Sequence, residues 1–279
     1  MNDTGDFIKR TLIKYIDFKK EKIIGLDNIF SKGIIKKIQN KKINNIIFTG
    51  MGSCYTAAVG VSKYLIKKFD EAGERQIKIQ ATISSEGSGF YLSKDMSDTL
   101  IVVLAQSGTT IDTNIYAKMA RERGAYTLVI TNKKEGDVTF IVEKTIYLGE
   151  GRDIEMSVPS TKTYICHLIL GYILAEKIVS YFKKTSSKKF IRNLNTLLKF
   201  NIANKTIINA EKQIEKLKFN PTLYSNWAVV YDDSINSFCA LEGRIKLSEC
   251  CYKSIPYYTI SQFKKINLSN CLVFYIGLK

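Results

Sequence analysis

The sequence predicts an α/β protein in which a parallel β-sheet is flanked by helices. The first observation is the segment 100–113, where five apolar residues, Leu100 to Leu104, precede a polar turn with a glycine and then a helical pattern. Such an apolar run is typical of a strand buried on both faces of a parallel sheet. The second observation is that residues 44–69 repeat the order of strand, glycine turn and helix. Strands that alternate with helices in this way predict helices on both faces of a parallel sheet.

The elements of the first two thirds of the chain follow from hydrophobic spacing and turn residues. Apolar residues at helical spacing predict an amphipathic helix over residues 7–24 and a second, basic helix over 29–39. Gly124 is expected to end a helix over 111–123 as its C′ residue. A flexible loop with one carboxylate is expected at 84–89, and a long apolar helix over 160–182. The expected strands cover residues 44–49, 77–83, 100–105, 126–131 and 144–148.

The last third of the chain predicts a linker and the beginning of a second α/β unit. Residues 187–217 have the pattern of helices that are polar and basic on one side, and strands are expected at 227–231 and 271–277 around a helix at 239–252. We therefore divide the chain into N-terminal helices (1–40), a first α/β domain (41–185), a helical linker (186–222) and a partial second unit (223–279).

Composition and charge favour a cytoplasmic protein that binds a small anionic molecule. The formal net charge is +16, but the lysines are spread along the chain and no nucleic-acid-binding motif accompanies them, so we expect most of them to be solvated surface. No apolar run approaches the ~20 residues of a membrane helix, and the N-terminus has no signal-peptide pattern. The six cysteines show no metal-binding spacing and there is a single histidine, so we expect reduced thiols, no metal site and no cofactor.

The turn at residues 106–110 carries residues that suit a phosphate group. Ser107, Thr109 and Thr110 place hydroxyls around Gly108, where the free amides and the positive end of the following helix favour an anion. The alternative is an ordinary strand–helix turn with a Ser/Thr N-cap. The turn at residues 50–55 contains two glycines but lacks the third glycine and the acidic strand end of a dinucleotide fingerprint, so NAD binding is not expected.

Three segments resemble, in order, the phosphosugar-binding loops of the sugar isomerase (SIS) domain family: GMGSCYTAA, LAQSGTTIDT and EMSVPSTKT. The family usually has CGTSYHA, SQSGETADT and EIGVASTKA, and the nearest branch is the isomerase domain of its aminotransferases. The resemblance implies an SIS-type, flavodoxin-like fold with one complete SIS unit and a truncated second one. It also implies that a sugar phosphate lies against these residues: Gly52, Ser53, Cys54, Gln106, Ser107, Gly108, Thr109, Thr110, Val158 and Ser160.

Some positions depart from the family pattern. The resemblance makes Ser107 and Thr110 the main phosphate contacts, whereas Cys54 stands where the family usually has a serine. Thr109 replaces a glutamate, and Pro159 replaces the alanine before the Ser-Thr-Lys triplet.

A further segment, CALEGRIKLSECCY at 239–252, resembles the family's ALEGALKLKEISY. Glu242, Lys246 and Glu249 are spaced by four and three residues, so they share one helix face. Without the other loops this would indicate only a solvated face with ion pairs. With them, the resemblance implies that Glu249 moves a proton between C1 and C2 of the sugar through an enediol(ate), and that Glu242 and Lys246 line the same pocket.

The sequence departs from an active aminotransferase branch in three ways. Lys265 stands where that branch has a histidine that opens the sugar ring, and it could replace the histidine only with a lowered pKa. We expect His167, on the apolar helix, to be a structural core residue. The chain ends at Lys279, so we expect no C-terminal lysine-bearing tail over the sugar, and its beginning predicts no glutaminase domain.

Three functional classes remain, of which the third, a basic nucleic-acid-associated protein, is disfavoured because no helix-turn-helix or stacking-aromatic pattern appears. The first is an enzyme acting on a hexose 6-phosphate of the fructose or glucosamine type: an isomerase, a deaminase or an ammonia-using relative. The second is a non-catalytic phosphosugar-binding module that regulates or joins a complex. The retained glutamates favour the enzyme, and the missing histidine favours the binder. Because SIS units generally pair, we also expect a homodimer.

Overall fold

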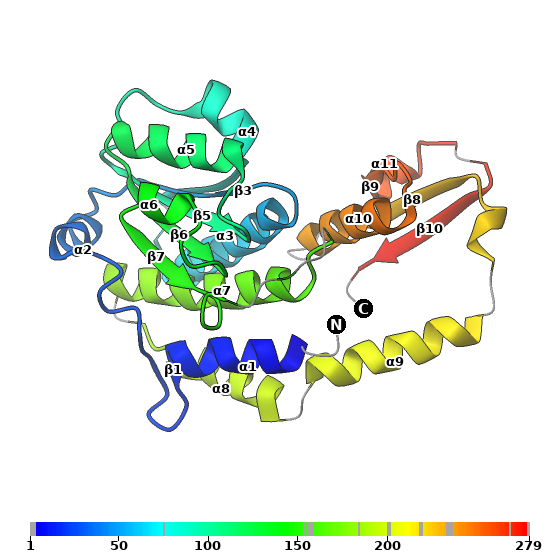
Figure 1. The fold of residues 1–279 in the computed structure, drawn as a ribbon, viewed down its shortest axis with the longest axis horizontal. Coiled ribbons are helices and arrows are strands. Elements are labelled where there is room, and N and C mark those ends of the chain that lie inside the picture. The colour runs from blue at the N-terminus through cyan, green and yellow to red at the C-terminus, as the bar shows by residue number, and fades with distance from the viewer. Residues whose placement is uncertain are drawn as a thin grey trace. The chain divides into compact units, whose positions relative to one another are not determined.

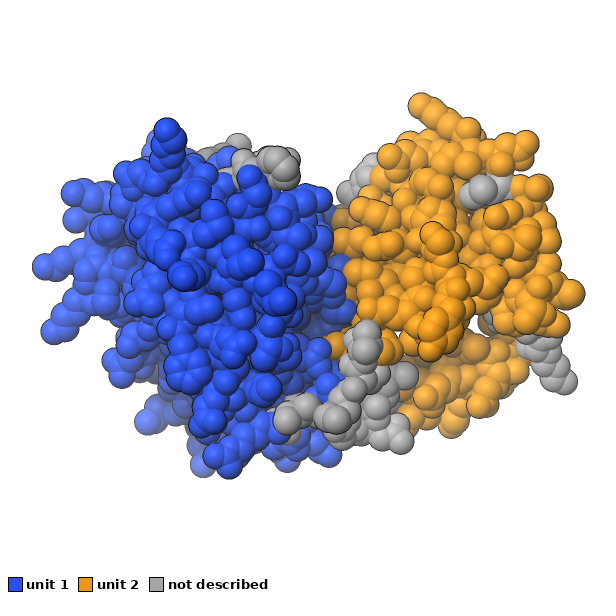
Figure 2. All heavy atoms as spheres, turned by 45° about the horizontal axis from the view of Figure 1, so that its top comes forward, with its two compact units in different colours: residues 1–156, 161–202 blue, residues 157–160, 203–279 orange. Residues whose placement is uncertain are grey.

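The computed structural model in Figure 1 describes residues 4–74, 76–152, 155, 159–183, 185–199, 202–217, 220–232, 237–267 and 269–277. The chain divides into two compact units, coloured separately in Figure 2. Unit 1 comprises residues 1–156 and 161–202, and unit 2 comprises residues 157–160 and 203–279.

Unit 1 is built on a five-stranded parallel sheet with the order β4-β3-β5-β6-β7. The strands are β3 (Asn45–Gly50), β4 (Lys78–Ile83), β5 (Thr99–Ala105), β6 (Tyr126–Thr131) and β7 (Lys144–Tyr147). The two strands that follow β3 in the chain lie on opposite sides of it, because β4 pairs with one edge of β3 and β5 with the other. The carboxyl ends of β3 and β5 therefore form a topological switch point, which is where ligands bind in open α/β sheets.

Helices cover both faces of this sheet (Figure 1). α3 (Ser53–Glu71) packs against α7 (Lys162–Phe182) on one face, and α1 (Thr4–Tyr15) and α2 (Lys32–Gln39) pack against α7. α5 (Ile111–Glu122) covers the other face together with α6 (Val138–Ile141), and the short helix α4 (Ser84–Glu86) lies beside α5. The predicted α/β architecture is confirmed.

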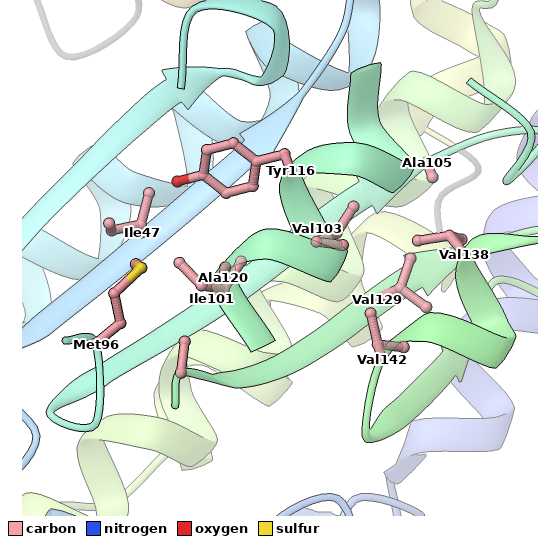
Figure 3. Packing of buried hydrophobic residues seen from close by; sticks show 12 residues of the cluster. Ile47, Met96, Ile101, Val103, Ala105, Tyr116, Ala120, Val129, Val138 and Val142 are labelled. Carbon is pink, nitrogen blue, oxygen red and sulfur yellow. The ribbon is translucent and has the colours of Figure 1, made fainter. Parts of the chain in front are cut away.

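The core between the sheet and α5 shows why the residues of β5 from Leu100 to Ala105 are apolar (Figure 3). Ile101, Val103 and Ala105 of β5 pack in one cluster with Tyr116 and other α5 residues. Because side chains alternate along a strand, Leu100, Val102 and Leu104 face the opposite layer. All seven residues of β5 are buried. A strand that is enclosed on both faces has no polar side to show in the sequence.

α7 is the helix in the described chain that is long and apolar enough to cross a membrane by length and composition. The expectation that no apolar run approaches this length is therefore wrong for α7. However, 56% of its apolar stretch is buried inside the protein, and it packs against α3, α1 and α2. Its hydrophobicity is accounted for by this position in the core of unit 1.

The N-terminal helix is shorter than predicted. α1 ends at Tyr15 and the chain continues as a small antiparallel hairpin, β1 (Ile16–Asp17) and β2 (Lys22–Ile23). The Asp17 carboxylate accepts hydrogen bonds from the amides of Lys19 and Lys20, both at 3.0 Å, and so stabilises a turn that competes with the helix. The second helix begins at Lys32 rather than residue 29, because the Ser31 hydroxyl caps it by accepting a hydrogen bond from the Ile34 amide.

The predicted loop at 84–89 is helical in the structure. It consists of α4 and a π-helix, η1 (Gly87–Tyr91), that contacts α5. A Cβ atom on Gly87 would lie 2.1 Å from a ring carbon of Tyr116, so a glycine is required for the backbone to pass over this buried ring. The ends of strands β3 to β7 lie within one residue of their predicted positions.

α1 closes one edge of the unit 1 sheet. The hydroxyl of Tyr15 donates a hydrogen bond to the carbonyl of Tyr147 in β7 at 2.7 Å and accepts one from the amide of the same residue at 3.1 Å. Next to it, the amide of Gly149 donates to the hydroxyl of Thr11 at 3.0 Å. Side chains of α1 thus satisfy backbone groups on the side of β7 that has no neighbouring strand.

Unit 2 contains a smaller parallel sheet with the order β10-β8-β9. Its elements are α9 (Ile202–Leu217), η2 (Pro221–Leu223), β8 (Asn226–Tyr231), α10 (Ser237–Cys251), β9 (Tyr257–Thr259), α11 (Ile260–Phe263) and β10 (Cys271–Ile276). Val229, Ala240 and Ile255 form its buried core. The sequence predicted β8, α10 and β10 but not the three-residue strand β9. The predicted linker contains α8 (Lys188–Lys199), which is grouped with unit 1, and most of α9, which is grouped with unit 2.

Candidate phosphosugar site

The turn between β3 and α3 is held tightly against the end of β5. A Cβ atom on Gly50 would lie 2.9 Å from the carbonyl oxygen of Leu104 and 2.9 Å from the Cβ atom of Cys54. Gly52 is the N-cap of α3 with φ 54°, and a Cβ atom there would meet nothing within 4 Å. α3 thus begins without a side-chain cap, and the Ser53 hydroxyl has no hydrogen-bond partner among the described residues.

Substitutions of these two glycines are expected to destabilise the turn for different reasons. Gly50→Ala forces the backbone of the turn away from Cys54 and Leu104, and we expect it to lower the free energy of unfolding by about 2 kcal/mol. Gly52→Ala meets no neighbouring atom, but its φ of 54° and ψ of −127° lie in a region essentially restricted to glycine, so we expect a loss of about 1–3 kcal/mol from the backbone alone. Urea denaturation followed by circular dichroism measures both changes, and an unchanged stability of either variant would contradict this account.

The turn between β5 and α5 exposes hydroxyl groups at the beginning of a helix. Ser107 Oγ accepts hydrogen bonds from the amide of Thr109 at 3.3 Å and from its hydroxyl at 2.9 Å. Thr110 is the N-cap of α5 but makes no side-chain cap, and its exposed hydroxyl has no partner among the described residues. Gly108 has φ 69° and its carbonyl accepts from the Val138 amide at 3.0 Å, which fixes the turn on α6.

The third predicted loop leads into α7, and its helix start is already occupied. Glu155 Oε1 accepts hydrogen bonds from the amides of Thr161 and Lys162 at 2.9 and 3.2 Å and from the Thr161 hydroxyl at 3.1 Å. Its Oε2 accepts from the Thr163 amide at 3.0 Å. Ser160 is buried, with 5% of its surface exposed. Val158 lies outside the described residues, so its predicted contact stays a prediction.

The three helix starts therefore differ in what they can offer an anion. The N–H groups in the first turn of a helix have no partner within the helix and carry partial positive charge. At α7 the Glu155 carboxylate accepts the hydrogen bonds of these groups. At α3 the N-cap is a glycine and the Cys54 amide donates to the carbonyl of Met51 at 3.0 Å. At α5 the Thr110 side chain makes no cap, and Asp112 in the first turn accepts no hydrogen bond from these groups among the described residues. Because β3 and β5 are adjacent and parallel, both helix starts lie at the same edge of the sheet.

Gln106 connects the β5–α5 turn to the loop before α7. Its side-chain NH2 group donates a hydrogen bond to the backbone carbonyl of Glu155 at 2.9 Å, and its backbone carbonyl accepts one from the Thr131 hydroxyl at 3.2 Å. The predicted ligand Gln106 is thereby held at both ends. Cys54, the other predicted contact in unit 1, is partly exposed in the first turn of α3.

In unit 2, α10 brings together the three charged residues that the sequence selected. Lys246 Nζ lies 2.8 Å from Glu249 Oε2 and 3.5 Å from Glu242 Oε1. The Glu242 side chain is 8% exposed, that of Lys246 18% and that of Glu249 31%. One ammonium group thus serves two carboxylates, of which the outer one, Glu249, remains accessible.

Glu249 lines a surface cavity of about 630 Å³ together with Pro159, Ser248, Cys250 and Tyr252. The Ser248 hydroxyl is buried and has no hydrogen-bond partner in the described part of the chain. An accessible carboxylate beside a lysine ammonium can accept a proton from a bound molecule and return it.

The fourth predicted catalytic residue is separate from this group. Lys265 is exposed in the turn after α11, where its amide donates to the Gln262 carbonyl at 3.0 Å. Among the described residues it forms no ion pair with the carboxylates of α10. The structure therefore gives no support to Lys265 as a replacement for the ring-opening histidine.

His167 is a core residue, as expected. It is 1% exposed, and its Nε2 lies 3.1 Å from the carbonyl oxygen of Ile130. Burial lowers its pKa to about 4 from an ordinary value of 6.5. The neutral ring is thus a structural part of the α7–β6 contact.

This histidine predicts a pH dependence of stability. Its pKa is lower in the folded than in the unfolded chain, so the unfolded chain binds more protons between pH 6.5 and about 4. The stability is complete above pH 6.5 and falls as the pH drops, by about 3 kcal/mol for a shift of this size. Urea denaturation of His167→Gln across this range should show a shallower loss than the unsubstituted chain, and identical slopes would contradict the assignment.

Sequence reasoning gave no role to Glu155, although this residue makes four hydrogen bonds to the beginning of α7. The signal was present in the EMSVPSTKT segment, where a glutamate precedes a Ser-Thr-Lys helix start by a few residues. A carboxylate in that position is a capping group for the helix that follows. The described residues contain no cluster of His, Cys, Asp and Glu side chains that could hold a metal ion.

Comparisons with known proteins agree with this fold and these turns. The SIS domain family matches residues 37–177. Glutamine–fructose-6-phosphate aminotransferase of Clostridium tetani is 31% identical over 267 residues, which cover 92% of this chain and 40% of that protein. The same enzyme of Pyrococcus horikoshii is 33% identical over 139 residues, covering 49% of this chain and 22% of that one. The chain thus spans about 40% of the length of the Clostridium relative.

Solved structures show the same fold. The C-terminal domain of glucosamine-fructose-6-phosphate aminotransferase from Francisella tularensis has a TM-score of 0.77 at 17% identity, covering 98% of this chain and 73% of that one. Glucosamine-6-phosphate deaminase from Thermotoga maritima has a TM-score of 0.64 at 17% identity, covering 96% and 76%. With a family match over half of its length and the turns described above, the chain belongs to the SIS domain family.

Proposed function

We propose that this protein binds a hexose 6-phosphate and moves a proton between C1 and C2 of the sugar, as an aldose–ketose isomerase or an amino-sugar-phosphate isomerase or deaminase. The observation that carries the proposal is the α10 triplet, in which Lys246 pairs with both Glu242 and Glu249 and leaves Glu249 accessible beside a cavity. A single carboxylate that can be reached by substrate is what an enediolate mechanism requires.

The turns that begin α3 and α5 have the properties of a phosphate-binding site. Two helix starts whose N-cap residues make no side-chain cap lie at a topological switch point, and the Ser53 and Thr110 hydroxyls beside them have no partner among the described residues. We assign the phosphate group of the substrate to these turns, with Ser107 and Gln106 as further contacts.

The substrate class follows from the relatives. Their names refer to fructose 6-phosphate and glucosamine 6-phosphate as molecules on which those proteins act. We propose the same class for this chain. In the mechanism Glu249 takes a proton from one carbon and returns it to its neighbour, while Lys246 offsets the negative charge of the intermediate.

A second candidate function is a phosphosugar-binding module without turnover. It is favoured by the exposed position of Lys265 away from the α10 triplet and by the burial of His167, because neither residue is placed to open a sugar ring. Such a module would keep the turns of α3 and α5 and would use the triplet only to hold hydroxyl groups.

Proton NMR in deuterium oxide distinguishes the two functions. The protein is incubated separately with fructose 6-phosphate, glucose 6-phosphate and glucosamine 6-phosphate, and the loss of the C1 or C2 proton signal is followed. Exchange with any of them supports proton transfer and identifies the substrate. Saturable binding without exchange would replace the enzyme by the binding module, and the absence of both would contradict the phosphosugar assignment.

We further propose that the protein is a homodimer in the cytoplasm. Large apolar side chains on α9, namely Ile208, Ile214 and Leu217, are 48–64% exposed, and burying them against a second copy would remove them from water. The six cysteines, all within the described chain, are free thiols, which suits a reducing compartment. Light scattering after size-exclusion chromatography tests the dimer, and fractionation of the cells tests the location.

A further inference from the structure

Glu155 makes two kinds of contact, one with the beginning of α7 and one with the turn that begins α5. Its carboxylate binds the backbone amides of Thr161, Lys162 and Thr163 at distances of 2.9–3.2 Å. Its backbone carbonyl accepts a hydrogen bond from the Gln106 side chain at 2.9 Å. One residue therefore joins the beginning of α7 to the turn that begins α5.

The Glu155 carboxylate determines whether the beginning of α7 can bind an anion. Three consecutive N–H groups at the positive end of a 21-residue helix would otherwise form a ready anion site. The negative charge of Glu155 satisfies these groups and repels a second anion from them. The start of α5 is not filled in this way, because Asp112, the carboxylate in its first turn, accepts no hydrogen bond from these amides in the described part of the chain. The N-cap of α3 is Gly52, which has no side chain to act as a cap.

We propose that Glu155 is a positioning residue that directs the phosphate group of the ligand to the turns of α3 and α5. It does so by filling the amide cluster of α7 with a carboxylate of the chain itself and by holding Gln106 in place. This inference rests on the phosphosugar-binding function proposed above and adds the residue that selects which helix start binds the phosphate.

The test measures whether the anion still depends on the α5 turn once Glu155 is removed. Inorganic phosphate is titrated, with phosphorus NMR as the readout, into the unsubstituted protein, Thr110→Val, Glu155→Ala and the double variant. Thr110→Val keeps the shape of the side chain and removes only the hydroxyl, so in the unsubstituted protein we expect about tenfold weaker binding. In the Glu155→Ala background we expect the same substitution to weaken binding by less than about twofold, because phosphate then binds the exposed amides of α7.

Glu150→Ala is the matched control, because Glu150 is an exposed carboxylate in the same connection. In that background the effect of Thr110→Val should remain about tenfold. If Glu155 has a purely structural role, Thr110→Val should still weaken phosphate binding about tenfold in the Glu155→Ala background, and this result would overturn the proposal. If Thr110→Val has no effect in the unsubstituted protein, the phosphate assignment itself fails together with the role of Glu155, so the two failures are distinguishable.

Circular dichroism melts establish whether each variant is folded. If Glu155→Ala does not fold, Glu155→Gln takes its place, since its side chain keeps one acceptor oxygen and loses the charge. The effect of Thr110→Val should then fall to an intermediate value, about threefold. A full tenfold effect in the folded Glu155→Gln background would overturn the proposal.

Discussion

Replacement of Glu249 by glutamine is expected to reduce the rate of proton exchange in a bound hexose 6-phosphate by at least ~100-fold, since a positioned general base contributes that much or more. The amide has nearly the same shape as the carboxylate but does not accept a proton. Lys246, 2.8 Å from Glu249 Oε2 in the unsubstituted protein, can still donate to the amide oxygen, so the helix should be preserved. Proton NMR in deuterium oxide measures the rate, and calorimetric titration of the same sugar shows whether binding is retained.

Glu211→Gln provides the control for this substitution. Glu211 is an exposed glutamate on α9, and its replacement changes the net charge of unit 2 by the same amount. Exchange should be unaffected in this variant. A Glu249→Gln variant that exchanges at the original rate would show that another group moves the proton, and the role of the α10 triplet would have to be abandoned.

Replacement of Glu176 by alanine is expected to have the largest effect on stability, a loss of about 3–5 kcal/mol. Glu176 is 2% exposed at the contact of α3, α7 and α8. Its Oε1 accepts from the Tyr64 hydroxyl at 2.6 Å and lies 3.1 Å from Lys68 Nζ, and its Oε2 accepts from the Ser187 hydroxyl at 2.8 Å. Burial and the neighbouring carboxylate raise the pKa of Tyr64 well above its usual value, so this hydroxyl stays a donor.

Glu71→Ala separates this buried network from an ordinary surface ion pair. Glu71 pairs with the same lysine, Lys68, at 3.1 Å, but its side chain is 52% exposed. Its removal should cost no more than about 1 kcal/mol. Denaturation by urea, followed by far-ultraviolet circular dichroism, compares the two variants, and similar losses would contradict the structural role assigned to Glu176.

The sheet of unit 1 and its two open turns could be predicted from the sequence for a clear reason. β5 is enclosed on both faces, so its residues from Leu100 to Ala105 are all apolar, and the glycines at positions 52 and 108 have positive φ angles that mark the turns. These are local signals that each segment carries by itself. The spacing of Glu242, Lys246 and Glu249 is also local, since a single helix determines it.

The features that escaped prediction depend on contacts between distant segments or on competing local ones. Residues 16–23 continue the helical spacing of α1, but Asp17 stabilises a turn instead. The strand β9 is three residues long and is formed by pairing with β8. Glu155 lies several residues before α7, so its segment indicates a capping carboxylate, but only the fold shows that this carboxylate reaches the amides of Thr161, Lys162 and Thr163.

The contact between α1 and β7 also bears on how the protein avoids aggregation. A sheet edge with free N–H and C=O groups can pair with a strand of another molecule. Tyr15 and Thr11 bind the backbone of Tyr147 and Gly149 and so occupy groups that such a strand would need. The N-terminal helix α1 therefore protects this sheet edge from pairing with a strand of another molecule. A variant that loses α1 should expose both the backbone of β7 and the apolar surface of α7 on which α1 packs, and should therefore associate into larger assemblies.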